Sequence, residues 1–399
     1  MSPSSSTRNR QFAVAAPGHV QFDEDKARAL LHHGSLRLLA LGTRRGATGV
    51  PTELTRLNPR IGLAAYAAAR TLSNFKAESF RFRLNPWFDR WVKKQLQSGD
   101  HLISSFGYTN AAFKWVRQHG GKAFLSAGNS HPENFWTVLT EEHQRWNCSD
   151  PPIARHHYER SLAMLADVDY VFAPSSFVAN SFLTRGFKPE QIIKDVYPIN
   201  LSTFTPATIP RDKNRPLTIV STGGVSLRKG APYLFEAFRL VLQRHPTARL
   251  RLTRVIQDSA LPVVARYAGL PIDWAPSLPH PQLVERLQDS DIFVLPSLEE
   301  GLVRTALEAM ACGLPVILTP NTGAADFVQP GVNGEIVPIR DPRAIADAIL
   351  KWADVAMHQS TPPTCKFDTS LLSFDHFEKQ FISQLVKLNL LDEKSFVPR

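Results

Sequence analysis

Short apolar runs alternate with amphipathic stretches along the first half of the chain. Short runs rich in β-branched and aromatic residues predict strands, and apolar residues spaced three or four apart predict helices. We expect strands at residues 11–18, 35–43, 101–106, 122–128 and 169–175. We expect helices at residues 23–34 and 109–119, and on both sides of the last strand within 159–186. Alternation of this kind is typical of a parallel sheet with helices on both faces.

The same alternation restarts in the second half of the chain. Strands are expected at residues 217–224, 248–255, 271–277, 291–297 and 314–320. Helices are expected at residues 230–244, 281–289, from about 304, and at 342–354. The sequence therefore predicts a second parallel α/β unit, followed by an amphipathic helix in the tail.

A proline-rich stretch separates the two alternating regions. Residues 199–216 contain little apolar sequence, and together with Pro198 they hold four prolines. A chain of 399 residues also exceeds the usual size of one hydrophobic core. The domains expected from these observations are a disordered tail at 1–10, an N-terminal domain at 11–198, a linker at 199–216, a C-terminal domain at 217–365, and a C-terminal helix within 366–399.

The charge and cysteine content exclude several classes of protein. The formal net charge is +10 and the pI is about 9.6, but no run of five or more Lys or Arg occurs. A basic chain could bind nucleic acid, an anionic membrane or a phosphorylated ligand. We find no helix-turn-helix, zinc-finger or aromatic-basic pattern, so nucleic acid is not an expected partner. Three widely separated cysteines support neither a disulfide framework nor a zinc site, and no apolar run reaches the length of a membrane span.

Two segments of the second unit follow predicted strands, where open α/β sheets bind their ligands. The first, STGGVSLRKGAPYLFEAF, carries Gly223 and Gly224, then Arg228 and Lys229, before a helix. Glycines let the backbone approach an anion, and two cations can neutralise it. The spacing matches neither a Walker loop nor a GxGxxG fingerprint, so this loop taken alone favours a solvated surface turn over an anion site.

The second segment, EEGLVRTALEAMACGLPVIL, places Glu300 at a strand-end turn and Glu308 about one turn into the following helix. Such carboxylates either complement the helix dipole or accept hydrogen bonds from sugar hydroxyls. The free amides after Glu300 could bind a phosphate. Carboxylates that bind hydroxyls, next to backbone amides that bind a phosphate, would form a site for a nucleotide sugar.

These motifs resemble those of the family 4 retaining glycosyltransferases, also called glycosyl transferases group 1. PSLEEGLVRTALEAMACGLPVILT is similar to the family's E-x7-E signature, SLRKGAPYLFEAF to its Lys-Gly loop, and NTGAADFVQPGVNGEIVP to the segment that follows the signature. The segments ADVDYVFAPSSFVANSFLTRG and VYPINLSTFTP resemble the end of the family's N-terminal domain and its crossover. The resemblance is strong over about 165–355 and weak before residue 100.

The resemblance implies a GT-B fold, with two Rossmann-like, doubly wound domains facing each other across a cleft. The N-terminal domain would bind the acceptor, and the C-terminal helix would cross back to it. The implied reaction is retaining transfer from a nucleotide diphosphate sugar, such as a UDP-, GDP- or ADP-sugar. The acceptor would be a glycan, a lipid-linked molecule or a small molecule. No metal or other cofactor is required in such a site. A cytoplasmic enzyme of glycoconjugate biosynthesis, with possible peripheral membrane contact, is the expected setting.

The resemblance also assigns roles to individual residues. Glu300 would hold donor-sugar hydroxyls and Glu308 the ribose hydroxyls, and Lys229 would neutralise the diphosphate. His131 would lie near the transferred sugar, and Glu300, Lys229 and His131 are the residues expected to be catalytic. The remaining residues expected at the donor site are Arg228, Gly223, Gly224, Gly301, Leu302 and Val303.

The sequence departs from the family pattern at two positions. The family often has an arginine at position 224, where this chain has Gly224, so Arg228 would have to replace its charge. The family often reads Glu-Gly-Phe-Gly after the first glutamate, where this chain reads EGLV. A non-catalytic GT-B protein that binds a nucleotide or a partner is therefore the alternative to an enzyme.

The acceptor side is less marked in the sequence. Gly18 and His19 follow the first strand and are expected to face the cleft. Arg44 and Arg45 also follow a strand, and either meet an anionic acceptor or lie in a solvated loop.

Overall fold

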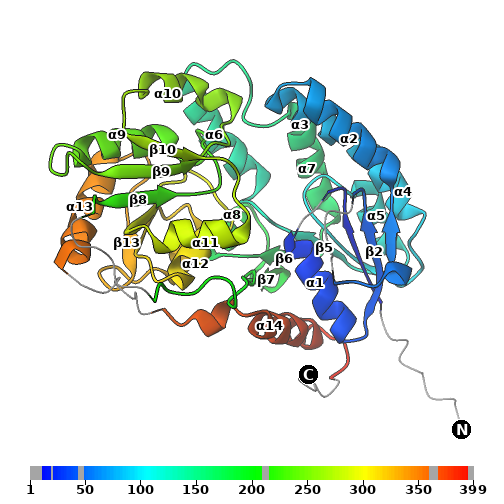
Figure 1. Ribbon diagram of the computed structural model, residues 1–399. Helices are drawn as coiled ribbons and strands as arrows, with labels where there is room; N and C mark the ends of the chain where they lie inside the picture. The colour runs from blue at the N-terminus through cyan, green and yellow to red at the C-terminus, as the bar shows by residue number, and fades with distance from the viewer. Residues whose placement is uncertain (1–10, 19–20, 44–48, 209–214, 359–366, 394–399) are drawn as a thin grey trace, which may run out of the picture.

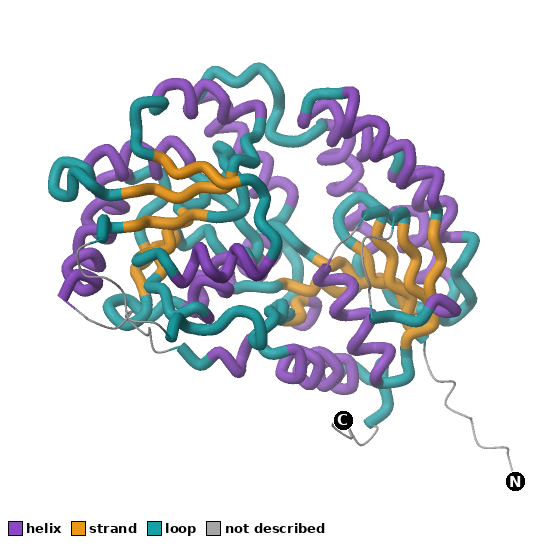
Figure 2. Tube along the Cα trace, in the orientation of Figure 1, coloured by secondary structure: helices purple, strands orange, loops and turns teal. Residues whose placement is uncertain are grey.

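The structure is a computed structural model that describes residues 11–18, 21–43, 49–208, 215–358 and 367–393. Its described residues form two parallel sheets, one in each half of the chain, and helices cover both sheets (Figures 1 and 2). The prediction of two α/β units with parallel strands is confirmed. The domain limits expected from the sequence remain predictions.

The N-terminal sheet has seven strands in the order β3-β2-β1-β4-β5-β6-β7. Its strands are β1 (Phe12–Ala16), β2 (Leu36–Leu41), β3 (Thr55–Leu57), β4 (His101–Ser104), β5 (Ala123–Ser126), β6 (Tyr170–Ala173) and β7 (Ile192–Lys194). The helices of this half are α1 (Gln21–His32), α2 (Pro59–Thr71), α3 (Asn74–Arg83), α4 (Asn85–Lys93), α5 (Asn110–Gln118), α6 (Pro132–Arg145), α7 (Arg155–Met164) and α8 (Ser176–Leu183).

The C-terminal sheet has six strands in the order β10-β9-β8-β11-β12-β13. Its strands are β8 (Thr218–Ser221), β9 (Arg249–Thr253), β10 (Ile272–Ala275), β11 (Ile292–Leu295), β12 (Val316–Leu318) and β13 (Gly334–Ile336). The helices are α9 (Ala231–Val241), α10 (Leu261–Arg266), α11 (His280–Gln288), α12 (Arg304–Ala311), α13 (Pro342–His358) and α14 (Phe374–Lys387).

Both sheets reverse their strand order at one internal position. In the N-terminal sheet the reversal lies between β1 and β4, and in the C-terminal sheet it lies between β8 and β11. At such a reversal the chain leaves two neighbouring strands in opposite directions, which opens a crevice at their carboxyl ends. The topology therefore marks the loops after β8 and β11 as the place to look for a ligand.

Each sheet is packed on both faces because successive side chains of a strand point to opposite sides. In β1, Ala13 belongs to one hydrophobic cluster of the N-terminal half, whereas Phe12 and Val14 belong to the other. In β8, Ile219 and Val220 likewise belong to different clusters. The near-continuous apolar runs in the sequence reflect this burial on both faces.

The last helix returns to the first half of the chain. Phe377, Phe381 and Leu385 of α14 lie in the same buried cluster as Phe12 and Leu30. Figure 1 shows α14 beside α1, although the two are separated by most of the sequence. The N-terminal core is thus completed by residues from the C-terminal end.

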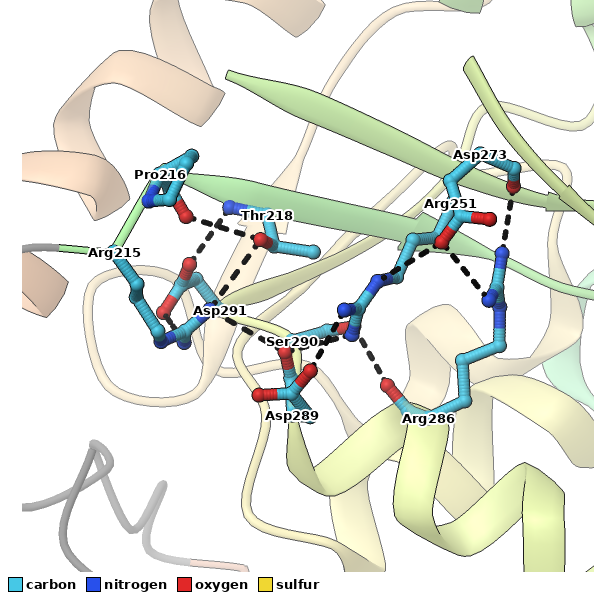
Figure 3. A network of polar contacts seen from close by, with 9 residues as sticks. All are labelled: Arg215, Pro216, Thr218, Arg251, Asp273, Arg286, Asp289, Ser290 and Asp291. Atoms are coloured by element: carbon cyan, nitrogen blue, oxygen red, sulfur yellow. Dashed lines mark hydrogen bonds and ion pairs between the residues drawn. The ribbon is translucent and has the colours of Figure 1, made fainter. Parts of the chain in front are cut away.

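A polar network joins the strands of the C-terminal sheet at the amino ends of β8 and β11, opposite the crevice at their carboxyl ends (Figure 3). Asp291, just before β11, accepts a hydrogen bond from the Thr218 N–H at 2.7 Å and lies 2.5 Å from Arg215. Arg251 of β9 lies 2.7 Å from Asp289. These contacts hold the strands in register. They do not involve the carboxyl ends of β8 and β11, where a ligand would bind.

Some elements differ from the sequence-based expectations. The segment 59–93 forms α2, α3 and α4, and residues 132–145 form α6, although no helix was expected in either stretch. The expected helix at 23–34 begins two residues earlier, at Gln21. Among the described residues, no helix combines the length and apolar character needed to cross a bilayer.

Candidate active site

Two loops meet at the reversal point of the C-terminal sheet. The first follows β8 and spans 222–230, and the second follows β11 and spans 296–303. Gly230 has φ 70°, and a Cβ there would lie 2.0 Å from the carbonyl oxygen of Pro296. Glycine at this position therefore allows the two loops to touch.

Three charged residues from these loops form a compact cluster. The Nζ of Lys229 lies 2.9 Å from a carboxylate oxygen of Glu300, and a guanidinium nitrogen of Arg228 lies 3.3 Å from the same oxygen. Burial tends to raise the pKa of Glu300, but the charges of Arg228 and Lys229 outweigh burial and the pKa is lowered. Glu300 stays ionised, and it holds two cations at the strand ends, where an anionic ligand would bind.

A second carboxylate, Glu299, joins this cluster to the other half of the chain. It is fully buried, accepts a hydrogen bond from the Ser130 N–H at 2.8 Å, and lies 3.2 Å from Arg228. Burial is the largest influence on its pKa and raises it, although Arg228 acts in the opposite direction. Sequence reasoning missed this residue; the tandem Glu299-Glu300 was the available signal.

Glu308 lies one helical turn into α12 and is buried. Burial raises its pKa from 4.5 to about 7, and Arg304 lowers it by less. Among the described residues, no group forms a hydrogen bond or ion pair with its carboxyl group. A ligand that supplies hydroxyl donors would satisfy this buried acid.

The start of α12 offers further unused donors. The amides of Leu302, Val303 and Thr305 donate to no acceptor in the described part of the chain. The Thr305 hydroxyl is also buried without a described partner. A Cβ added to Gly223 would lie 3.4 Å from the Lys229 Nζ and 3.8 Å from the Thr305 hydroxyl, so these groups are neighbours. Thr305 was not among the residues predicted from the sequence.

Gly301 contacts the opposite half of the protein. A Cβ there would lie 2.1 Å from the Gly128 carbonyl oxygen, and the Gly301 carbonyl accepts a hydrogen bond from the Ser175 hydroxyl at 2.7 Å. The side chains of Leu302 and Val303 are buried in the C-terminal core. The EGLV sequence therefore places its two larger side chains in the core.

The backbone at position 224, where the family often has an arginine, favours glycine. Gly224 has φ 90°, and a Cβ there would lie 2.8 Å from the carbonyl oxygen of Val255. An L-residue at this position would be strained in both backbone and contacts. The cationic charge of this loop is instead supplied by Arg228 and Lys229.

His131 occupies the first position before α6. Its Nδ1 accepts a hydrogen bond from the Glu133 N–H at 3.2 Å, and its ring packs edge-on against Phe182. Burial is the main cause that lowers its pKa to about 4, with help from Arg185. The side chain is a neutral helix cap in this structure, and its catalytic role remains a prediction.

A cavity of about 480 Å³ lies between the two halves. On the N-terminal side it is lined by aromatic residues that include Phe22, Phe106 and Tyr158, and on the C-terminal side by Arg228 and Gln257. It therefore reaches the charged cluster at one end.

An outer cavity of about 740 Å³ adjoins the first and shares Glu78, Phe82 and Tyr108 with it. Gly18, predicted on the acceptor side, lines this outer cavity. His19, Arg44 and Arg45 lie outside the described residues.

Comparisons with known proteins agree with this geometry. Residues 216–354 match the family model "Glycosyl transferases group 1". The putative colanic acid biosynthesis glycosyltransferase WcaL of Salmonella typhimurium is 24% identical over 216 residues, which cover 52% of this chain and 53% of WcaL. The chain thus spans about half the length of this curated relative.

Two solved structures show how far the likeness extends in three dimensions. Sucrose-phosphate synthase of Thermosynechococcus elongatus has a TM-score of 0.65 at 18% identity, and the match covers 96% of this chain and 100% of that chain. HepE of Anabaena, in complex with UDP and glucose, has a TM-score of 0.62 at 14% identity, with 95% and 100% covered. The fold expected from the sequence, GT-B, is confirmed.

Proposed function

We propose that this chain transfers a sugar from a nucleotide diphosphate sugar to an acceptor, with retention of configuration; the match of residues 216–354 to the model of the group 1 glycosyltransferases supports this. The observation that carries the proposal is the cluster of Arg228, Lys229 and Glu300 at the reversal point of the C-terminal sheet. It provides positive charge for a leaving diphosphate beside an ionised acid for sugar hydroxyls.

The role proposed for each residue follows from its charge or from its unused hydrogen-bond donors. As the bond between the sugar and the diphosphate breaks, negative charge grows on the departing phosphate. Lys229, Arg228 and the free amides at the start of α12 stabilise that charge, which lowers the barrier. Glu300 accepts hydrogen bonds from the donor sugar, and Glu308 accepts them from the ribose. The departing phosphate assists deprotonation of the acceptor, so no protein nucleophile takes part.

The acceptor is proposed to bind in the cavity between the halves. The aromatic faces of Phe22, Phe106 and Tyr158 offer apolar surface to a glycan or another hydroxyl-bearing molecule. Charge neutralisation by Lys229 and Arg228 leads us to propose that transfer needs no divalent metal. Addition of EDTA should then leave the rate unchanged.

The second candidate function is nucleotide binding without transfer. It is favoured by one observation: the same Glu300 oxygen is engaged by both Arg228 and Lys229. If these ion pairs persist when a donor is bound, Glu300 is not free to hold the sugar.

The first experiment is a thermal-shift screen of the wild type and Lys229→Ala with UDP, GDP, ADP and their glucose conjugates. Ligands that bind only the folded state raise the unfolding temperature. The stabilising nucleotide sugar is then incubated with candidate glycan acceptors, and the anomeric configuration of the product is read by NMR. Lys379→Ala, on α14, serves as a matched control.

We expect one nucleotide to stabilise the wild type and the control. Lys229→Ala should lower the turnover rate by about a hundredfold to a thousandfold, as loss of one charge-stabilising group does elsewhere. Nucleotide binding without transfer or hydrolysis of any donor would favour the second function. Unchanged turnover in Lys229→Ala would contradict the proposed role of this cluster.

A further inference from the structure

The helices α2, α3 and α4 carry an unusual surface. Six of the ten exposed large hydrophobic side chains in the described part of the chain fall between residues 57 and 87. They are Leu57, Leu63, Tyr66, Leu72, Phe80 and Trp87. Leu63 and Trp87 are 68% and 62% exposed. We refer to the exposed surface of residues 56–94 as the α2–α4 face.

The positive charge of the protein is concentrated on the same face. Residues 56–94 contain nine basic and two acidic residues, a net charge of +7 against +10 for the whole chain. All nine basic residues are exposed, whereas Asp89 is buried against Arg160. Among the described residues, only Arg81 of the nine forms an ion pair, 3.6 Å from Glu78. The face is therefore strongly cationic and poorly neutralised.

Basic and apolar side chains occur together along one stripe of each helix. On α2 the exposed stripe runs through Arg60, Leu63, Tyr66 and Arg70, at spacings of three and four. The stripe on α3 consists of Lys76, Phe80 and Arg83, and the stripe on α4 of Trp87 and Arg90, with Lys94 directly after the helix. Positions three or four apart share a side of a helix, so each helix presents mixed basic and apolar groups to solvent. This spacing also explains why the sequence shows no long basic run.

We propose that the α2–α4 face docks the protein onto the surface of an anionic phospholipid bilayer. Exposed Leu, Phe, Trp and Tyr side chains can enter the boundary between headgroups and acyl chains, while Lys and Arg bind the phosphate groups around them. Soluble proteins rarely expose so many large apolar side chains in one region unless that region binds a partner or a membrane. Aliphatic Leu57, Leu63 and Leu72 suit acyl chains, whereas single-stranded nucleic acid is bound mainly by aromatic stacking and basic groups.

The outer cavity opens beside this face. Leu57, Leu63 and Tyr66 belong both to the exposed apolar set and to the lining of the 740 Å³ cavity. Apolar surface therefore continues from α2 into the protein, and it gives an acyl chain of a docked lipid a place to enter. Figure 1 shows α2, α3 and α4 together along the outer margin of the N-terminal half, away from α14.

The test is sedimentation with vesicles of phosphatidylcholine alone or of equal parts phosphatidylcholine and phosphatidylglycerol. Lys76→Glu with Arg83→Glu removes charge from the face, and Leu63→Ser with Trp87→Ser removes apolar area. Lys379→Glu with Lys387→Glu on α14, and Val332→Ser with Leu371→Ser, are matched controls at other exposed positions. Thermal unfolding confirms that each variant is folded. No sugar donor is needed, so the outcome is independent of transfer activity.

We expect the wild type and both controls to sediment with the anionic vesicles, more weakly as salt is raised. Each variant of the face should bind at least about tenfold more weakly. The proposal is overturned if the wild type stays in solution with anionic vesicles, or if the controls lose as much binding as the variants of the face. Tight binding to duplex DNA or RNA without vesicle binding would assign the face to nucleic acid instead.

Discussion

At the scale of single residues, Glu308 shows how a group proposed to bind a ligand can lower the stability of the free protein. Its side chain is largely buried, and no described residue forms a hydrogen bond or ion pair with its carboxyl group, so its ionised form is poorly stabilised. The raised pKa, about 7 against 4.5, expresses this penalty. A nucleotide whose hydroxyls donate to the carboxylate would remove it.

Replacement of this acid by an amide of equal size should separate stability from binding. Between the ordinary pKa of 4.5 and the folded-state value of about 7, the folded protein holds the Glu308 proton more often than the unfolded chain does. Stability from this group is therefore present at low pH and is lost as pH rises through about 7. Without ligand, Glu308→Gln should be more stable than the wild type at pH 8, by at most about 3 kcal/mol, and the gain should vanish below pH 4.5.

Urea denaturation of both proteins across this pH range measures the difference. The variant should also bind nucleotide more weakly at pH 8, because an amide supplies a poorer acceptor for hydroxyl donors than a carboxylate. A pH-independent difference in stability would show that the Glu308 carboxyl group is not the origin of the penalty.

The sequence predicted those residues of the candidate site that a contiguous motif contains. Lys229, Glu300 and Glu308 lie in two short segments, and the structure brings Lys229 and Glu300 into contact. Glu299 depends on Ser130, which is 169 positions away in the sequence. No local sequence pattern predicts the hydrogen bond between Ser130 and Glu299, because it forms only when the two halves of the chain pack together.

At the scale of elements, the buried strands were the predictable part of the fold. β1, β8 and β11 are apolar on both faces, and their runs are visible without any partner. α2, α3 and α4 were not predicted, because their exposed stripes carry apolar residues where a water-facing helix would be polar. α6 begins with His131 as its cap, which is not among the residues that usually mark a helix start.

The far end of α6 is joined to the C-terminal half by a buried ion pair. Glu142 is fully buried, and its carboxylate lies 2.9 Å from Arg340 and accepts a hydrogen bond from the Tyr233 hydroxyl at 2.8 Å. Removal of one member leaves the other charge buried without its partner, which is more costly than loss of an exposed pair.

Arg340→Ala should therefore lower the free energy of unfolding by about 3 kcal/mol. Arg117→Ala, which breaks ion pairs of a partly exposed arginine with Asp167 at 3.2 Å and Asp169 at 3.5 Å, should lower it by about 1 kcal/mol or less. Urea denaturation compares the two, and adding Glu142→Gln to Arg340→Ala should recover part of the loss. Equal effects of the two arginine variants would show that the charge of Glu142 is compensated by other groups.

At the scale of the whole molecule, an ion pair, a hydrogen bond and the packing of α14 connect the two halves. Asp25 of α1 lies 2.5 Å from Arg304 of α12, and the Ser176 N–H donates to Asp326 at 2.7 Å. α14 adds a different kind of tie, because it belongs to the second half in sequence and to the first half in packing. The folding of the N-terminal sheet therefore depends on a helix that follows the C-terminal sheet in the sequence.

Phe381→Ala should test this dependence. Phe381 is 2% exposed, and its ring centre lies 5.3 Å from that of Phe172 in β6. Loss of the ring leaves a cavity in the N-terminal core and should lower stability by about 3–5 kcal/mol. In hydrogen exchange, amides of β1, β5 and β6 should lose protection, whereas those of β8 and β11 should keep it. Phe238→Ala, in the C-terminal core, should give the reverse pattern. Equal loss of protection in both sheets would mean that the ties at Arg304 and Asp326 make the two halves one cooperative unit.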